Sequence, residues 1–250
     1  MITVAQVTKL YGSFKAVDDV SLSVARGEIH GFLGPNGAGK TTTIRIVAGL
    51  LKPTSGTVTI DGHELAHQPE AAKAALGFIP DRPFLYEKLT AEELLRFHGG
   101  LYDMRAADIA ARSSELLELF ELSSWRGELI ESFSNGMKQR LVMCAAFLHR
   151  PRAVLVDEPM VGLDPRGALL IKDVFRRMSR EGVGILMSTH TLEVAEEMCD
   201  RISIIQDGRI IAQGSVAELR SLSGGPDPAL TAVFLRLTGG SGLRELEGAP

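Results

Sequence analysis

Nine consecutive residues have the types and the spacing of a phosphate-binding loop. Their glycines let backbone N–H groups approach an anion closely, because no side chain stands in the way. Lys40 can reach the β- and γ-phosphates of a nucleotide, and the hydroxyl of Thr41 can ligate Mg²⁺. We therefore expect a nucleoside triphosphate and Mg²⁺ to bind here. The segment reads Gly34, Pro35, Asn36, Gly37, Ala38, Gly39, Lys40, Thr41 and Thr42, which fits G-x-x-x-x-G-K-[ST].

The segments on either side of this loop are the elements that would position it. Ile29–Leu33 is a short apolar run that predicts a buried strand, and residues 42–48 predict a helix. A strand, a loop and a helix in this order place backbone N–H groups and a helix N-terminus around an anion. The local context therefore favours nucleotide binding over a chance match.

A second candidate for chemistry is a pair of carboxylates in the other half of the chain. The apolar run Ala153–Asp157 predicts a strand, and Glu158 follows it directly. Phosphoryl transfer needs one group for the metal ion and another for the attacking water. We assign Asp157 to the metal side and Glu158 to the water.

The motifs, in this order, resemble the ATP-binding subunit of an ATP-binding-cassette (ABC) transporter over residues 3–215. Residues 132–140, Ser-Phe-Ser-Asn-Gly-Met-Lys-Gln-Arg, resemble the signature of that family, with Ser134 and Gly136 at its phosphate-contacting positions. Tyr11 matches the aromatic residue that stacks on adenine. Asp164 matches the loop that crosses the interface between subunits, and His190 matches the histidine that contacts the γ-phosphate.

This resemblance implies a fold and partners. The fold would be α/β, with a P-loop NTPase core, an antiparallel β subdomain and a helical subdomain. The signature would face the ATP of a second ABC ATPase subunit, a copy or a paralogue, so that two subunits enclose two ATP molecules. An integral membrane permease subunit would receive the resulting motion, and ATP and Mg²⁺ would be the cofactors. The chain would power a transporter, with the exporter branch favoured, and no nucleic acid partner is expected.

The chain departs from the family pattern at two places. The signature begins Phe-Ser-Asn-Gly-Met instead of Leu-Ser-Gly-Gly-Gln, a form similar to that of bacterial exporter ATPases. Asp81 stands where the family has a glutamine that meets Mg²⁺ or the water. A carboxylate keeps an oxygen ligand but adds a charge, so Asp81 is either a metal ligand or a residue facing solvent or the membrane subunit.

Composition sets limits on location and partners. The net charge of −4 gives no global basic field that would attract nucleic acid. No apolar run approaches the ~20 residues that cross a bilayer, and the first residues lack the pattern of a secretory signal. We expect a cytoplasmic protein, held at the cytoplasmic face of the cell membrane by a permease. Cys144 and Cys199 are expected to be reduced and buried.

The expected organisation is a single ABC ATPase domain over residues 1–214, with a helical subdomain inserted at about residues 90–150. Residues 90–93, Thr-Ala-Glu-Glu, form a capping box that predicts a helix start. A C-terminal helical extension and a flexible tail would follow over residues 215–250, with a short helix at 215–222 and a frayed end from 239.

Three other interpretations fit parts of the sequence. Residues 63–67, His-Glu-Leu-Ala-His, fit the H-E-x-x-H zinc-protease pattern, but they follow a turn, precede a proline and lack a third ligand, which favours coincidence. A soluble ABC-type ATPase, such as an iron–sulfur assembly accessory protein, is an alternative of suitable length. A kinase or GTPase switch is disfavoured by the signature-like segment and His190.

Overall fold

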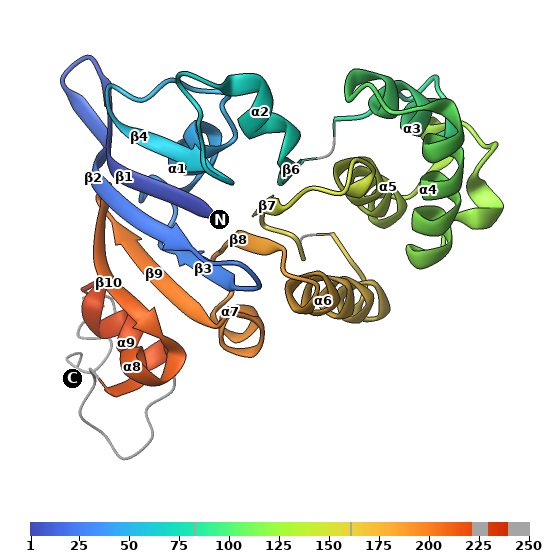
Figure 1. The fold of residues 1–250 in the computed structure, drawn as a ribbon. Helices are drawn as coiled ribbons and strands as arrows, with labels where there is room; N and C mark the ends of the chain where they lie inside the picture. Colours follow the sequence, from blue (N-terminus) through green and yellow to red (C-terminus); the bar gives the residue numbers. More distant parts are fainter. Residues whose placement is uncertain (83, 161, 222–229, 240–250) are drawn as a thin grey trace.

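The computed structural model describes residues 1–82, 84–160, 162–221 and 230–239. It contains two β-sheets and a group of helices beside them, as Figure 1 shows. The strands are β1 (Ile2–Tyr11), β2 (Phe14–Val24), β3 (Ile29–Leu33), β4 (Ser55–Ile60), β5 (His63–Glu64), β6 (Leu76–Ile79), β7 (Ala153–Asp157), β8 (Gly184–Thr189), β9 (Arg201–Gln206) and β10 (Arg209–Ser215). The α-helices are α1 (Lys40–Val47), α2 (Pro69–Ala74), α3 (Ala91–Leu101), α4 (Ala106–Leu119), α5 (Asn135–Phe147), α6 (Pro165–Arg180), α7 (Leu192–Met198), α8 (Val216–Ser221) and α9 (Leu230–Leu237).

The central sheet has the strand order β10-β9-β3-β8-β7-β6, and all of its neighbouring pairs except β10–β9 are parallel. Strands buried on both faces read as continuous apolar runs, which explains why β3 and β7 are buried along their whole length. Because β3, β8 and β7 are neighbours, the segments that follow them meet at one edge of the sheet. The phosphate loop and the Asp157–Glu158 pair follow two of these strands.

A second, antiparallel sheet covers one side of the core, in the order β2-β1-β4-β5. Its inward side chains, such as Val4 and Leu22, join one buried cluster with Ile44 of α1 and with Leu155 of β7. The alternating side chains of β7, Val154 and Val156, belong to the other main cluster. The central sheet is therefore buried on both faces, as a parallel sheet requires.

The helices α3, α4 and α5 form a group beside the central sheet, drawn in green to olive-yellow at the right of Figure 1. The capping box at Thr90 is confirmed, because its hydroxyl accepts from the N–H of Glu93 and the Glu93 carboxylate accepts from the N–H of Thr90. Leu116 and Leu117 of α4 are buried against α3 and α5. The expected fold class is confirmed by this combination of sheets and helices.

Two predicted helices have different bounds in the structure. The first begins at Lys40 instead of residue 42, because Gly39 takes up the N-cap position with a φ of 107°. Lys40 and Thr41 therefore lie in the first turn, where N–H groups have no intrahelical partner. The C-terminal helix α8 covers Val216–Ser221, while Leu222 and the predicted tail after Gly239 lie outside the described residues.

The H-E-x-x-H segment is not a helix: His63 and Glu64 form the short strand β5, and Nδ1 of His67 lies 3.1 Å from Glu64 instead. Cys144 and Cys199 are free and buried, and burial raises the pKa of both thiols. No helix within the described ranges is long and apolar enough to cross a membrane.

Candidate active site

The phosphate loop is held tightly against the segments around it. A Cβ atom on Gly34 would lie 2.4 Å from the carbonyl oxygen of Ile205, and one on Gly39 would lie 2.5 Å from that of Ala16. Only glycine fits at these two positions, because backbone atoms cannot move aside as a flexible side chain can. The neighbouring backbone therefore constrains the path of the loop at both glycines.

The side chain of Lys40 folds over this loop. Its ammonium group donates hydrogen bonds to the carbonyl oxygens of Gly34 at 2.7 Å and Pro35 at 3.1 Å. Burial lowers the pKa of Lys40, and the negative charges of Glu158 and Asp157 oppose this effect. Lys40 thus lies in the electrostatic field of both carboxylates, which come from a distant part of the sequence.

A cavity of about 250 Å³ lies beside the loop. Tyr11 and Phe14, which pair across the β1–β2 hairpin, line it together and are 50% and 65% exposed. Aromatic faces of this kind can stack on a base. Tyr11 was expected here, but Phe14 was missed, although the turn at Gly12 between two strands could have indicated an aromatic on each side. The other lining residues are Ala16, Asn36, Gly37, Gly39, Lys40, Thr41 and Thr42.

Asp157 lies at the end of β7 and is buried. The hydroxyl of Ser188, at the neighbouring position of β8, donates a hydrogen bond to its Oδ1. Burial raises the pKa of Asp157, and the nearby charges of Asp81 and Glu158 act in the same direction, while Ser188 and Lys40 act against them. The charges of two other carboxylates therefore act on Asp157. Sequence reasoning gave no role to Ser188.

Glu158 and His190 meet across the ends of β7 and β8. Nδ1 of His190 lies 2.8 Å from Oε1 of Glu158. The backbone of Glu158 has a φ of 50°, in the left-handed region, and its N–H donates to the carbonyl oxygen of Ser188 at 3.1 Å. A non-glycine residue in this region is uncommon and often marks a functional site. The turn directs the Glu158 side chain to His190.

The signature-like residues lie on another part of the surface. Ser134 is the N-cap of α5, and its hydroxyl accepts from the N–H of Met137 at 3.3 Å. Asp164 is the N-cap of α6 and accepts from the N–H of Gly167 at 2.8 Å. A Cβ on Gly136 would lie 3.7 Å from the carbonyl oxygen of Gly162, so the two segments are adjacent. None of these residues lines the cavity beside the phosphate loop.

Comparisons with known proteins agree with this geometry. The family described as "ABC transporter" matches residues 17–161. The daunorubicin resistance ATP-binding protein DrrA3 of Streptomyces coeruleorubidus is 39% identical over 90% of this chain and 71% of the relative. The linearmycin resistance ATP-binding protein LnrL of Bacillus subtilis is 37% identical over 90% of this chain and 72% of the relative.

Solved structures give the same result. A structure described as an ATP-binding subunit of an ABC transporter has a TM-score of 0.90 and 36% identity, and the match covers 95% of this chain and 99% of that one. A dimeric ATP-binding cassette, MJ0796, bound to ADP and Pi has a TM-score of 0.79 and 26% identity, over 86% of this chain and 99% of that one.

The fold and the phosphate loop define an ATP-binding cassette, and the chain belongs to the ABC transporter family. It is the ATP-binding and ATP-hydrolysing subunit of an exporter-like transporter, as the resemblance implied. These relatives favour a transporter subunit over the soluble accessory ATPase that was the alternative. Cassettes of this family act as dimers together with a transmembrane component.

Proposed function

We propose that Asp157, Glu158 and His190 carry out the hydrolytic chemistry of this ATPase together with the phosphate loop. Glu158 orients the attacking water, and His190 holds the Glu158 carboxylate and reaches the γ-phosphate. Lys40 and the loop N–H groups hold the phosphates, while the aromatic pair Tyr11 and Phe14 receives the base. The 2.8 Å contact between Glu158 and His190 is the observation that carries this proposal.

Mg²⁺ fits the same edge of the sheet. Among residues of the described ranges, no group of three or more His, Cys, Asp or Glu side chains could hold a metal ion alone. Phosphate oxygens would therefore have to complete the ligands offered by Thr41 and Asp157. Burial beside other carboxylates raises the pKa of Asp157, and a cation would relieve that repulsion. When bound, Mg²⁺ neutralises charge on the phosphates.

Asp81 is the third oxygen donor that we assign to this metal ion. It follows β6, the neighbour of β7, so it lies at the same edge of the sheet as Asp157. The influence of its charge on Asp157 supports this placement. A carboxylate is a harder ligand for Mg²⁺ than the amide it replaces.

We propose further that the complete site is shared between two subunits. Ser134, Gly136 and Asp164 lie outside the cavity beside the loop, and the first two are assigned to the ATP of the partner. The partner is a second copy or a paralogue. ATP would close the two subunits, and hydrolysis would reopen them, because the nucleotide states differ in their affinity for the closed form.

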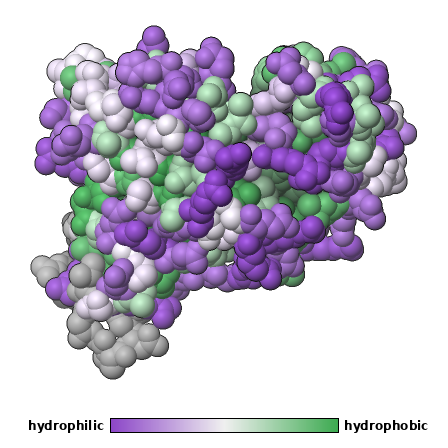
Figure 2. Space-filling model, in the orientation of Figure 1, coloured by the Kyte–Doolittle hydropathy of each residue, from purple (hydrophilic) through white to green (hydrophobic). Residues whose placement is uncertain are grey.

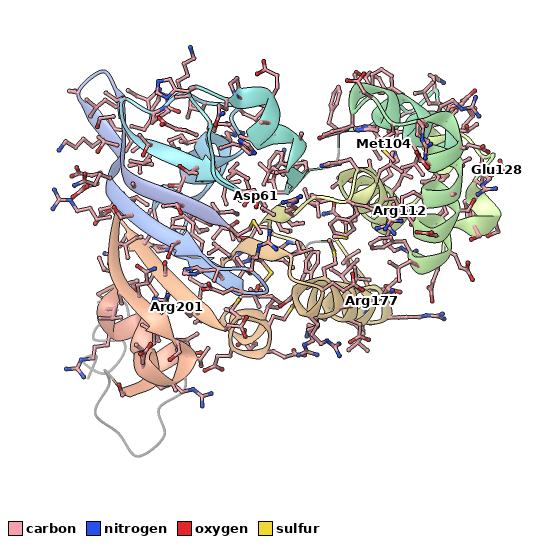
Figure 3. All side chains as sticks on the ribbon, in the orientation of Figure 1. Asp61, Met104, Arg112, Glu128, Arg177 and Arg201 are labelled. Atoms are coloured by element: carbon pink, nitrogen blue, oxygen red, sulfur yellow. The ribbon has the colours of Figure 1, made fainter. Side chains whose placement is uncertain are left out.

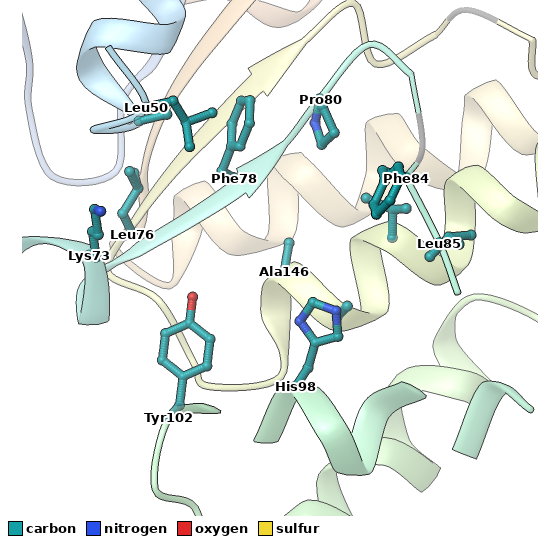
Figure 4. A pocket seen from close by; sticks show the side chains of 13 residues that line it. Leu50, Lys73, Leu76, Phe78, Pro80, Phe84, Leu85, His98, Tyr102 and Ala146 are labelled. Carbon is teal, nitrogen blue, oxygen red and sulfur yellow. The ribbon is translucent and has the colours of Figure 1, made fainter. Parts of the chain in front are cut away.

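A groove between the core and the helical group is our candidate for contact with a permease. The cavity, of about 310 Å³, lies between β6 and the helices α3 and α5, and Figure 4 shows Phe78, Phe84, His98 and Tyr102 around it. Phe84 is 83% exposed and lies edge-on to Tyr86. Exposed apolar patches of this kind mark contact sites. Contact with a permease would place the cassette at the cytoplasmic face of the membrane. The names of the relatives, daunorubicin and linearmycin resistance proteins, suggest that the transported substrates are drugs.

Complementation between two inactive variants tests the shared site. We expect Lys40→Ala and Ser134→Arg proteins to be inactive alone. A mixed dimer has one site with neither change, so mixing should give ATPase activity above the sum of the two parents. The control is the double variant Lys40→Ala/Ser134→Arg mixed with the unchanged chain, since both sites of that mixed dimer are damaged. No gain on mixing the single variants would contradict the shared site.

A further inference from the structure

A second large cavity lies at the opposite edge of the central sheet from the phosphate loop. Its volume is about 720 Å³, a size common for small-molecule sites. Pro151 and Arg152 precede β7, and Gly182 and Val183 precede β8, whereas the residues of the ATP site follow these strands. The cavity is therefore separated from the nucleotide site by the length of the strands.

Arginine side chains from several elements converge on this cavity. One comes from the β2–β3 turn, one from α4, two from the segment between α5 and β7, and one from α6. Figure 2 shows hydrophilic residues around a hollow in the middle of this face, and Figure 3 labels two of the arginines on either side of it. The five lining arginines are Arg26, Arg112, Arg150, Arg152 and Arg177.

The acidic partners of these arginines are fewer than the arginines themselves. Asp61 pairs with Arg152 at 3.0 Å and with Arg26 at 3.7 Å. Glu115 pairs with Arg112 at 2.8 Å and with Arg150 at 3.8 Å.

Glu181 pairs with Arg177 at 3.0 Å. Within the described part of the chain, the five guanidinium groups thus share three carboxylates in their ion pairs, so arginines outnumber acids by two in these pairs.

Arg112 is the least solvated of the lining arginines in these ion pairs. Its side chain is only 24% exposed, compared with 72% for Arg150. The Nε atom of Arg112 is buried and has no hydrogen-bond partner among the described residues. Glu115 already pairs with the charge of Arg112, but a buried donor without an acceptor is still costly.

We infer that this cavity binds a small phosphorylated molecule carrying at least two negative charges. Guanidinium groups match phosphate oxygens with paired hydrogen bonds, and here they converge from separate walls. A hollow of this size suits a small molecule, whereas a nucleic acid backbone needs an extended basic stripe. The ligand would contact both α4 of the helical group and Arg177 of the core, so binding would hold these two parts together.

Calorimetric titration with inorganic tripolyphosphate tests this site. The titration uses Lys40→Ala protein at low salt, because that change weakens the phosphate loop as a competing site. We expect one molecule to bind per chain and to raise the melting temperature. Adding Arg150→Gln/Arg177→Gln to the Lys40→Ala protein should weaken tripolyphosphate binding about tenfold, because two exposed pairs between arginine and phosphate are lost. Arg150→Lys/Arg177→Lys, which keeps the charges, should weaken it less.

The matched control is Arg96→Gln/Arg166→Gln in the same protein. These arginines are 69% and 80% exposed and pair with single acids away from the cavity. We expect the control to bind tripolyphosphate as the Lys40→Ala protein does. The inference would be overturned if the Lys40→Ala protein did not bind tripolyphosphate. It would also be overturned if the cavity variants bound as tightly as that protein, or if the control variant lost as much affinity as the cavity variant. Melting curves without tripolyphosphate show that each variant is folded.

Discussion

Oε1 of Glu158 accepts a 2.8 Å hydrogen bond from Nδ1 of His190, across the ends of two neighbouring parallel strands. A carboxylate oxygen can only accept, so Nδ1 carries the proton in this contact. The Glu158 side chain is 17% exposed and that of His190 is 59% exposed. The carboxylate is thus mostly shielded from solvent, while the histidine that contacts it remains exposed.

His190→Ala is expected to lower kcat by roughly 10²-fold, which is the lower end of the range for loss of general acid–base function. The reason is that the Glu158 carboxylate is still present in this variant but has lost the hydrogen-bond partner that orients it. KM should change little if the contact acts only in the transition state. Steady-state ATPase kinetics give both values. A raised KM with an unchanged kcat would instead assign His190 to nucleotide binding alone.

Substitutions of Asp81 should change the Mg²⁺ requirement. Asp81→Asn, Asp81→Gln and Asp81→Ala proteins should all need more Mg²⁺ for half-maximal ATPase activity, with alanine needing most, because alanine supplies no oxygen. Asp103→Asn, at an acidic residue between α3 and α4, is the control. Unchanged Mg²⁺ curves with loss of transport alone would place Asp81 at the permease contact.

The aromatic pair at the cavity gives a third prediction. Phe14→Ala should weaken ATP binding by an amount similar to Tyr11→Ala, because both rings line the same cavity. Loss of a stacked ring costs ~1–3 kcal/mol, which is ~5–150-fold in Kd. Titration calorimetry without Mg²⁺ measures this, with Phe97→Ala as a control at an exposed aromatic residue elsewhere. Binding by Phe14→Ala protein equal to the unchanged chain would leave Tyr11 as the only stacking residue.

Much of the site was predictable because its parts are local. The phosphate loop is a continuous motif, and the strands before it and before Glu158 are unbroken apolar runs. Their meeting at one edge follows from the parallel sheet. The role of His190 came only from the resemblance, since a single histidine after a strand carries no signal of its own.

Other features depend on residues that are distant in the sequence. Phe14 joins the cavity because the β1–β2 hairpin folds towards the phosphate loop, and Ser188 reaches Asp157 because β7 and β8 are neighbours. The basic cavity gathers arginines from four segments, each of which would look like an ordinary surface residue in the sequence. Composition could not reveal it, because the net charge of the chain is negative.

The most direct test of the central claim is light scattering on the Glu158→Gln protein with saturating ATP and Mg²⁺. The account predicts ATP-bound particles of twice the mass of the single chain, and turnover reduced by ~10²–10⁴-fold. Adding Ser134→Arg to the same protein should abolish the dimer, since the partner's site is then blocked. A Glu158→Gln chain that stays monomeric with ATP, or that turns over at a near-normal rate, would contradict it.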